Sequence, residues 1–437
     1  MKRLMIVMIA AATFSLYAQP ANENVRTITV EDAVVLASDN NISLKRQKIT
    51  LDALEKRNKT SWNSVSPSAS LSGNFGLPFD GMISEMKTSD KYTYGFGASA
   101  SLSLTPSLYT SIKDAKLKYE SGKTSYEDAV RQVELNVRKL FYSLLYTKES
   151  IALQKRNMEM ARLRYENNRD KYNRGQLSEL DLLQSQYSYE SQRPSIESAE
   201  IAYQNNVASF KQALGISQNE KIELSGSISD AIPPESFSVN QNVEDLPSVK
   251  KIQASIELQK NSLLSTRFTA YAPSIGVSYS WGMNNLSDKV SDITKTTKNE
   301  VHSLSFNVRL PLDGYLPWST GALSVSAQKG ALQDLELQLE NEKTTAALNL
   351  QNSIKNILQK QSQMEMLNRN VEIAQKSYDM TLTAYNHGSR DLLTLQNASD
   401  ALLKAKTDRE SHIYNLICAV LDLENTLGLP FGTLGKE

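Results

Sequence analysis

The residues of this chain that most often carry out chemistry are few and stand far apart. The three histidines, His302, His387 and His412, have no metal-type spacing to one another or to the single cysteine, Cys418. Glycine-rich phosphate loops and nucleophile-elbow motifs are absent from the sequence. Cys418 lies in the apolar segment 415–421, where a small buried hydrophobic residue is the expected role. The sequence therefore predicts no enzyme activity, no metal site and no cofactor.

A second group of residues recurs at a fixed interval. The segment Tyr172–Gly175, Tyr-Asn-Arg-Gly, returns 213 residues later as Tyr385–Gly388, Tyr-Asn-His-Gly. Because the match needs no gap, it predicts two copies of one structural unit. The turn glycines, Gly175 and Gly388, are expected in left-handed conformations just after a helix. The same shift relates Ala161 to Ala374, Tyr165 to Tyr378, Leu182 to Leu395, and Leu214-Gly215 to Leu427-Gly428.

Most of the remaining sequence predicts helices. Apolar residues recur at coiled-coil-like spacing, for example at Val130, Val133 and Val137, which indicates helices packed along their length. The two longest predicted helices hold about 67 residues each and would reach about 100 Å. The predicted helices cover residues 31–62, 107–173, 178–214, 245–270, 319–386 and 391–427.

Four shorter stretches alternate between apolar and small polar residues. Successive side chains of a strand point to opposite faces, so each stretch predicts a strand with one apolar face and one hydroxyl-rich face. Strands of about ten residues with this pattern are typical of a transmembrane barrel around water, and a soluble sheet with one wet face is the alternative. We expect two hairpins, 68–79 with 92–104 and 274–283 with 301–310, joined by polar loops at 80–91 and 284–300.

The start of the chain has the pattern of a secretory signal peptide. Lys2 and Arg3 precede a short apolar core, and cleavage is expected after Ala18. Gln19 follows, where a lipoprotein would have its modified cysteine. No later run of about 18 apolar residues exists, so helical membrane spans are excluded and a closed β-barrel is the only membrane structure left.

Four strands cannot close a barrel, and an open sheet edge is not stable in lipid. Three copies of the chain would supply twelve strands, and two copies would supply eight with a narrower bore. The formal net charge of zero gives no reason to expect a nucleic-acid partner. The pattern divides the chain into a signal peptide (1–18), a first repeat (19–216), a linker (217–244), a second repeat (245–428) and a tail (429–437). We expect linker and tail to wrap around the outside of the helices.

In the order of its elements the chain resembles the TolC-like outer membrane efflux protein family. The resemblance rests on the duplicated helix–strand–strand–helix–helix order, the two Tyr-x-x-Gly turns and the Leu-Gly endings. It implies a mainly α fold with a β-barrel contribution, in which each protomer of a homotrimer adds four strands to a 12-stranded transmembrane barrel in outer membrane lipid. The duplicated long helices would form an α-barrel tunnel across the periplasm. The implied partners are a periplasmic adaptor (membrane fusion) protein and an inner-membrane pump, in tripartite efflux or type I secretion.

The resemblance also implies a gate at the periplasmic tip of the tunnel. By position, its residues are Asp181, six residues after Gly175, together with Tyr385 and Arg390 on either side of Gly388. They would form a hydrogen-bonded and ionic link that holds the tip closed. An arginine–carboxylate pair is the strongest such link available to side chains.

The sequence departs from the family pattern just after the second turn. Thr394 and Asn397 stand where the best-known members have pore-facing carboxylates, so no acidic constriction ring is expected there. Asp391 and Glu179 could supply negative charge nearby, or each could be a helix N-terminal acid favoured by the helix dipole.

Two other functions fit part of the pattern. A structural or adhesive coiled-coil surface protein with a barrel anchor would also combine long helices with strands, but such an anchor usually lies at one end of the chain. A soluble periplasmic coiled-coil adaptor would leave the alternating strands unexplained.

Overall fold

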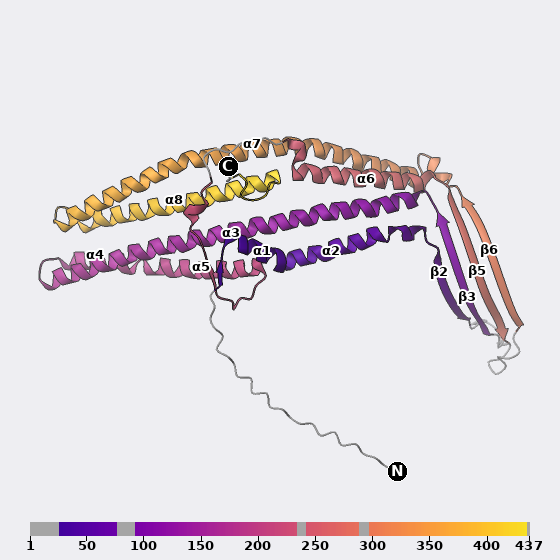
Figure 1. Ribbon diagram of the computed structural model, residues 1–437, viewed down its shortest axis with the longest axis horizontal. Helices are drawn as coiled ribbons and strands as arrows, with labels where there is room; N and C mark the ends of the chain where they lie inside the picture. Colours follow the sequence, from indigo (N-terminus) through magenta and orange to yellow (C-terminus); the bar gives the residue numbers. More distant parts are fainter. Residues whose placement is uncertain (1–25, 77–91, 234–241, 288–296, 435–437) are drawn as a thin grey trace, which may run out of the picture.

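The computed structural model describes residues 26–76, 92–233, 242–287 and 297–434. The molecule is long and thin, with helices along most of its length and the large sheet at one end (Figure 1). The predicted signal peptide and residues 80–91 of the first predicted loop lie outside the described residues. In chain order the helices and strands are β1 (Arg26–Ile28), α1 (Val30–Asn40), α2 (Ile42–Lys59), β2 (Ser68–Gly76), β3 (Tyr92–Leu104), α3 (Ser107–Asn173), α4 (Glu179–Glu190), α5 (Arg193–Leu214), β4 (Ile222–Leu224), α6 (Pro247–Tyr271), β5 (Ser274–Ser287), β6 (Thr297–Arg309), α7 (Thr320–Asn386) and α8 (Leu392–Leu427).

The two longest helices match the prediction within one residue. α3 and α7 each hold 67 residues, and each ends at a tight turn far from the sheet (Figure 1). α8 pairs with α7, while α4 and α5 follow one another along α3. No helix in the described ranges is both long enough and apolar enough to cross a membrane.

The prediction of one continuous helix over 31–62 was wrong, because Asn41 interrupts it. The Asn41 side-chain oxygen accepts hydrogen bonds from the backbone N–H groups of Ser43 at 2.9 Å and Leu44 at 3.3 Å. Its side-chain nitrogen donates to the carbonyl of Ala213 at 2.8 Å, which ties the break to the end of α5. The Asn41 side chain thus supplies a partner to two backbone N–H groups in the first turn of the second helix, which have no partner within that helix.

The predicted helix over 178–214 is also divided, at Ser191 and Gln192 between α4 and α5. Pro194 stands in the first turn of α5. Proline has no N–H to donate and its ring crowds the carbonyl four residues earlier, so the helix cannot continue through it undisturbed.

The large sheet has the order β2-β3-β5-β6 and is antiparallel throughout. The two predicted hairpins therefore join through β3 and β5, while β2 and β6 form the outer edges. Two strands are longer than predicted, because β5 extends to Ser287 and β6 begins at Thr297, within the second predicted loop. Residues 288–296 between them, and 77–79 after β2, lie outside the described part of the chain.

The two faces of this sheet differ as the alternation predicts. On one face, serine hydroxyls pair across β2 and β3, Ser68 with Ser101 and Ser70 with Ser99, each at 2.8 Å. Large apolar side chains on the other face are exposed in the single chain. They include Leu71, Phe75, Phe96, Ile275, Tyr279, Leu304, Phe306 and Val308.

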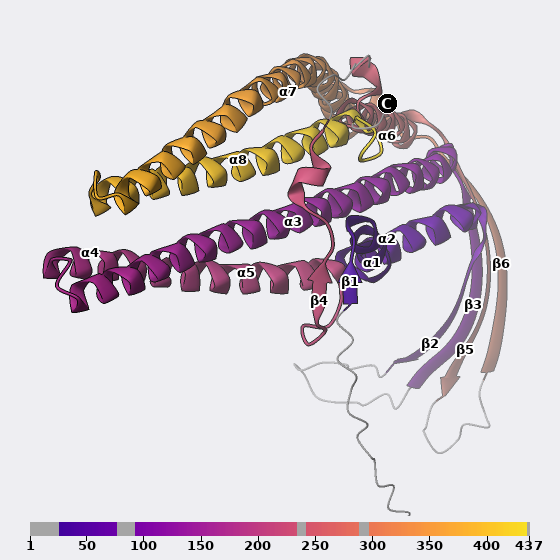
Figure 2. The same cartoon turned by 60° about the vertical axis from the view of Figure 1, so that its left-hand side comes forward.

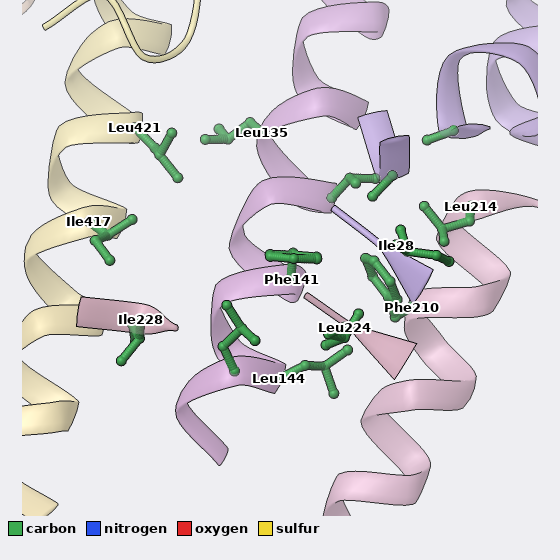
Figure 3. Close-up of a cluster of buried hydrophobic side chains, with 14 of the residues drawn as sticks. Ile28, Leu135, Phe141, Leu144, Phe210, Leu214, Leu224, Ile228, Ile417 and Leu421 are labelled. Atoms are coloured by element: carbon green, nitrogen blue, oxygen red, sulfur yellow. The ribbon is translucent and has the colours of Figure 1, made fainter. Parts of the chain in front are cut away.

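The main core lies near the middle of the molecule, where both halves of the chain meet (Figure 3). Phe141 of α3 is central to it, with its ring 6.2 Å from that of Phe210 of α5. Leu135 of α3 points toward Leu421 of α8, so this cluster joins α3 to α8 as well as to α5 (Figure 3).

The linker contributes to this core and is not simply wrapped around the outside, as the sequence suggested. Its strand β4 pairs in parallel with β1, beside the long helices (Figure 2). Leu224 and Ile228 of the linker are buried in the cluster. The tail is held by Glu424, whose buried carboxylate accepts hydrogen bonds from the backbone N–H groups of Gly432 and Leu434, both at 2.9 Å.

Candidate gate at the helical tip

The two Tyr-x-x-Gly turns have the same backbone structure. Gly175 and Gly388 have φ angles of +73° and +76°, which confirms the predicted left-handed conformation. Each glycine N–H donates to the carbonyl of the tyrosine three residues earlier, at 2.8 Å to Tyr172 and 2.9 Å to Tyr385. A second bond, at 2.9 Å in both copies, completes the Schellman motif, from Gln176 to Lys171 and from Ser389 to Ala384.

Asp181 lies in the first turn of α4 and is held by that helix itself. Its backbone N–H donates to the Ser178 hydroxyl oxygen at 3.1 Å, and the Ser178 hydroxyl donates to the Asp181 carboxylate at 2.7 Å. The side chain is half-buried, which leaves part of the carboxylate accessible to a further partner.

Asp391 is the N-cap of α8, the place that Ser178 takes at the start of α4. Its carboxylate accepts from the Thr394 backbone N–H at 2.8 Å, and hydrogen bonding by Thr394 holds the pKa of Asp391 below its ordinary value. Asp391 is therefore a helix N-terminal acid, one of the two roles considered from the sequence. Thr394 is half-buried and Asn397 is exposed.

Tyr385 makes a contact that the sequence did not predict. Its hydroxyl donates to the side-chain oxygen of Asn168 on α3 at 2.9 Å, and the Lys171 ammonium lies 5.8 Å from its ring centre. Asn168 is only 1% exposed. Asn168 is a polar residue at a core position in the long apolar pattern of α3, and this was the signal that could have revealed its contact with Tyr385.

Arg390 is exposed just after the second turn and forms no ion pair with any described residue of its own chain. It lines a groove of about 510 Å³ along α7, together with Ile373, Lys376, Met380 and other α7 residues. Within one chain, no hydrogen bond or ion pair of the described residues joins Asp181, Tyr385 and Arg390 to one another.

A buried acid lies further from the tip, between α3 and α8. Glu410 is 9% exposed, and only one of its carboxylate oxygens has a partner, the Arg409 guanidinium at 2.7 Å. Burial raises the pKa of Glu410, Arg409 opposes this shift, and the negative charge of Glu149 on α3 adds to it. The Glu149 carboxylate is itself bound by the Ser227 hydroxyl at 2.9 Å.

Replacing Glu410 by glutamine is expected to raise the melting temperature at pH 7.5 and to leave it unchanged at pH 4. The folded protein keeps the Glu410 proton to higher pH than the unfolded chain, so the native state loses stability as pH rises above the ordinary glutamate pKa of 4.5. Glutamine stays neutral and avoids this loss. Thermal unfolding of purified protein in detergent across pH 4–8 measures the difference. An equal shift at every pH would contradict the explanation.

Comparison with known proteins identifies the family. The outer membrane efflux protein family model matches residues 33–216 and 244–429, so the chain belongs to this family. It is a TolC-like outer membrane channel of the efflux class and not an enzyme, with its helical part forming a tunnel in the periplasm. Membership decides against the adhesin and the soluble adaptor. No curated protein matches the chain.

Several solved channels share the fold at low sequence identity. The CusC structure is 14% identical, with a TM-score of 0.75 over 98% of this chain and 99% of that chain. The Campylobacter jejuni CmeC outer membrane channel is 17% identical, with a TM-score of 0.74 over 91% and 85%. The Neisseria gonorrhoeae MtrE outer membrane channel, solved in its open state, is also 17% identical, with a TM-score of 0.71 over 92% and 89%.

Proposed function

We propose that three copies of the chain close a twelve-stranded barrel and a continuous helical tunnel, which passively conducts substrates out of the cell. The observation that carries this proposal is the sheet of four strands with an exposed apolar face and two open edges, β2 and β6. Unpaired backbone groups are too costly in lipid, so β6 of one copy must pair with β2 of the next until the ring closes.

The helices carry two exposed apolar surfaces, one on α7 and one on α4 and α5, that can pack against each other between neighbouring copies. Along one long edge of the molecule, α7 exposes apolar side chains, among them Met366, Ile373 and Met380 at heptad spacing. α4 and α5 lie near the other edge (Figure 1). α4 exposes Leu180, Leu183 and Tyr187, and α5 exposes Ile201. Exposed apolar side chains in a row along a helix are typical of interfaces. Because the two rows lie on helices at opposite edges, each copy can pack against the next.

The same packing would complete the gate. Arg390 lines the α7 groove beside Met380, and Asp181 lies on α4 between Leu180 and Leu183 in sequence. When the two rows meet, Arg390 of one copy can form an ion pair with Asp181 of its neighbour. Such a pair at a wet tip contributes about 1 kcal/mol or less, so three pairs would close the tip and still allow it to open.

We further propose that substrates reach the tunnel from a periplasmic adaptor and an inner-membrane pump, in tripartite efflux or type I secretion. The chain contributes no catalytic group to this transport, and energy comes from the pump. The two segments matched by the family model, 33–216 and 244–429, support the proposed division into two repeats, 19–216 and 245–428. We place the signal peptide before the first repeat, the linker between the repeats and the tail after the second.

The protein is expected to fractionate with outer membranes as a trimer, and Arg390→Ala is expected to raise single-channel conductance in planar bilayers. Removing the guanidinium breaks all three tip pairs at once. Arg369→Ala is the matched control, since Arg369 is an exposed α7 arginine farther from the turn. If Arg390→Ala shows the same conductance and antibiotic leakage as the unchanged protein, the proposed Arg390 gate is contradicted. If the protein fractionates as a monomer, the proposed channel is contradicted.

A further inference from the structure

The hydroxyl-rich face of the large sheet carries almost no charge. Cross-strand partners share a face of the sheet, so the register identifies this face on all four strands. Among the side chains of this face that the structure describes, Arg309 is the only charged one. The others are Ser68, Ser70, Ser72 and Asn74 of β2, Ser99, Ser101 and Ser103 of β3, Ser274, Ser278 and Ser280 of β5, and Val301, Ser303, Ser305 and Asn307 of β6.

Arg309 lies at the end of the sheet that adjoins the helices. It is the last residue of β6, whose arrow in Figure 1 points toward α6 and α7. Its cross-strand partner is Ser274, the first residue of β5. The next pair along the two strands is Gly276 with Asn307, and the Asn307 side chain lies over the glycine. Arg309 therefore has the longest side chain on this face and stands among small neighbours.

The charge of Arg309 is not neutralised within the described part of the chain. Its side chain is exposed and forms no ion pair or hydrogen bond with any described residue. The next acidic residue along the chain, Asp313, lines a groove between α6 and α7 together with Thr266 and Thr320, and it does not bind Arg309. The guanidinium is thus free to meet solutes on the hydroxyl-rich side of the sheet.

We propose that Arg309 sets the charge preference of the channel, in favour of solutes that carry phosphate or carboxylate groups. In the proposed trimer the hydroxyl-rich face lines the water-filled lumen, so three Arg309 guanidinium groups form a ring where the barrel meets the helical tunnel. Rings of arginine or lysine favour anions in pores. Arginine also binds carboxylate and phosphate groups through two parallel hydrogen bonds. This inference rests on the proposed channel function and adds a substrate class to it.

Reversal potentials in planar bilayers across a KCl gradient test the ring. Arg309→Gln is expected to lower the chloride-to-potassium permeability ratio by about threefold in dilute salt, because three positive charges leave the lumen. The difference should disappear near about 1 M KCl, where the screening length is only about 3 Å. Arg309→Lys keeps the charge and should keep the ratio. Charges elsewhere in the tunnel are the same in every variant and cancel in the comparison.

Two further substitutions on β6 serve as controls. Glu300 lies on the apolar face, opposite Met283, so Glu300→Gln removes a charge outside the lumen and should leave the ratio unchanged. Asn307→Arg adds a second charge on the face of Arg309 and should raise the ratio. General damage to the barrel would not produce shifts of opposite sign from Arg309→Gln and Asn307→Arg.

Inorganic tripolyphosphate tests whether the ring binds the proposed class of solute. Added to either side of the bilayer, it is expected to reduce the current through the unchanged protein. Arg309→Gln is expected to raise the half-blocking concentration by about tenfold, the effect of losing charge-assisted hydrogen bonds to phosphate. Glu300→Gln should leave the block as it is.

The outcomes separate this inference from the proposed function. If the unchanged protein forms no channel, the proposed function fails. If the protein conducts but Arg309→Gln leaves the permeability ratio or the tripolyphosphate block unchanged, the Arg309 ring is overturned alone. A ratio that falls equally in Arg309→Lys and Arg309→Gln would also overturn it, since the charge would then not be the cause.

Discussion

Replacing Leu304 by arginine is expected to abolish assembly of the protein in the outer membrane. Leu304 lies midway along β6 opposite Tyr279 and is 61% exposed on the apolar face of the sheet. An arginine that faces lipid near the bilayer midplane costs about 2–4 kcal/mol, and a trimer would carry three of them. The amount of trimer in isolated outer membranes measures the effect.

The neighbouring position supplies the control. Ser303 pairs with Ser280 on the opposite, hydroxyl-rich face. If that face lines water, Ser303→Arg should assemble normally and shift ion selectivity toward anions. Equal assembly of both variants would show that the apolar face does not meet lipid.

Removing the ring of Phe141 is expected to cause the largest loss of stability in the helical part. Phe141 is 2% exposed, and its ring lies edge-on to that of Tyr142 at 5.8 Å. The Phe141 ring is also tilted against that of Phe210 (Figure 3). Truncation of a buried phenylalanine to alanine costs about 3–5 kcal/mol, because the cavity collapses only in part. Urea unfolding of the protein in detergent measures the change.

Phe141→Leu keeps most of the volume and should cost about 1.5 kcal/mol or less. A loss below about 1 kcal/mol for Phe141→Ala would mean that this cluster does not fix the middle of the molecule.

Local patterns in the sequence predicted most of the fold. Heptad spacing located α3 and α7 within one residue, and period-two alternation located the hairpins. The breaks at Asn41 and before Pro194 were not predicted, although asparagine is a common helix N-cap and proline commonly interrupts a helix. Asn41 caps the second helix through the nearby N–H groups of Ser43 and Leu44. Its additional bond to the distant Ala213 ties the break to α5, and no local pattern reveals that contact.

The gate was predictable in part. The spacing around Gly175 and Gly388 gave the two turns, because a left-handed turn imposes a local requirement that glycine meets. The partner of Tyr385 was not predictable in this way, since Asn168 comes from another helix 217 residues away in sequence. Only the polar side chain of Asn168 at a buried position of α3 marked that face as unusual.

Disulfide cross-linking between the sheet edges tests the central claim most directly. In a Cys418→Ser background, Ser68→Cys on β2 is combined in turn with Ser303→Cys, Ser305→Cys or Asn307→Cys on β6, and outer membranes are oxidised. If β6 of each chain pairs with β2 of the next in a closed ring of three, at least one pair will give covalent species of two and three chains and none larger. Absence of any cross-link between chains, or a ladder that continues beyond three, would contradict the account.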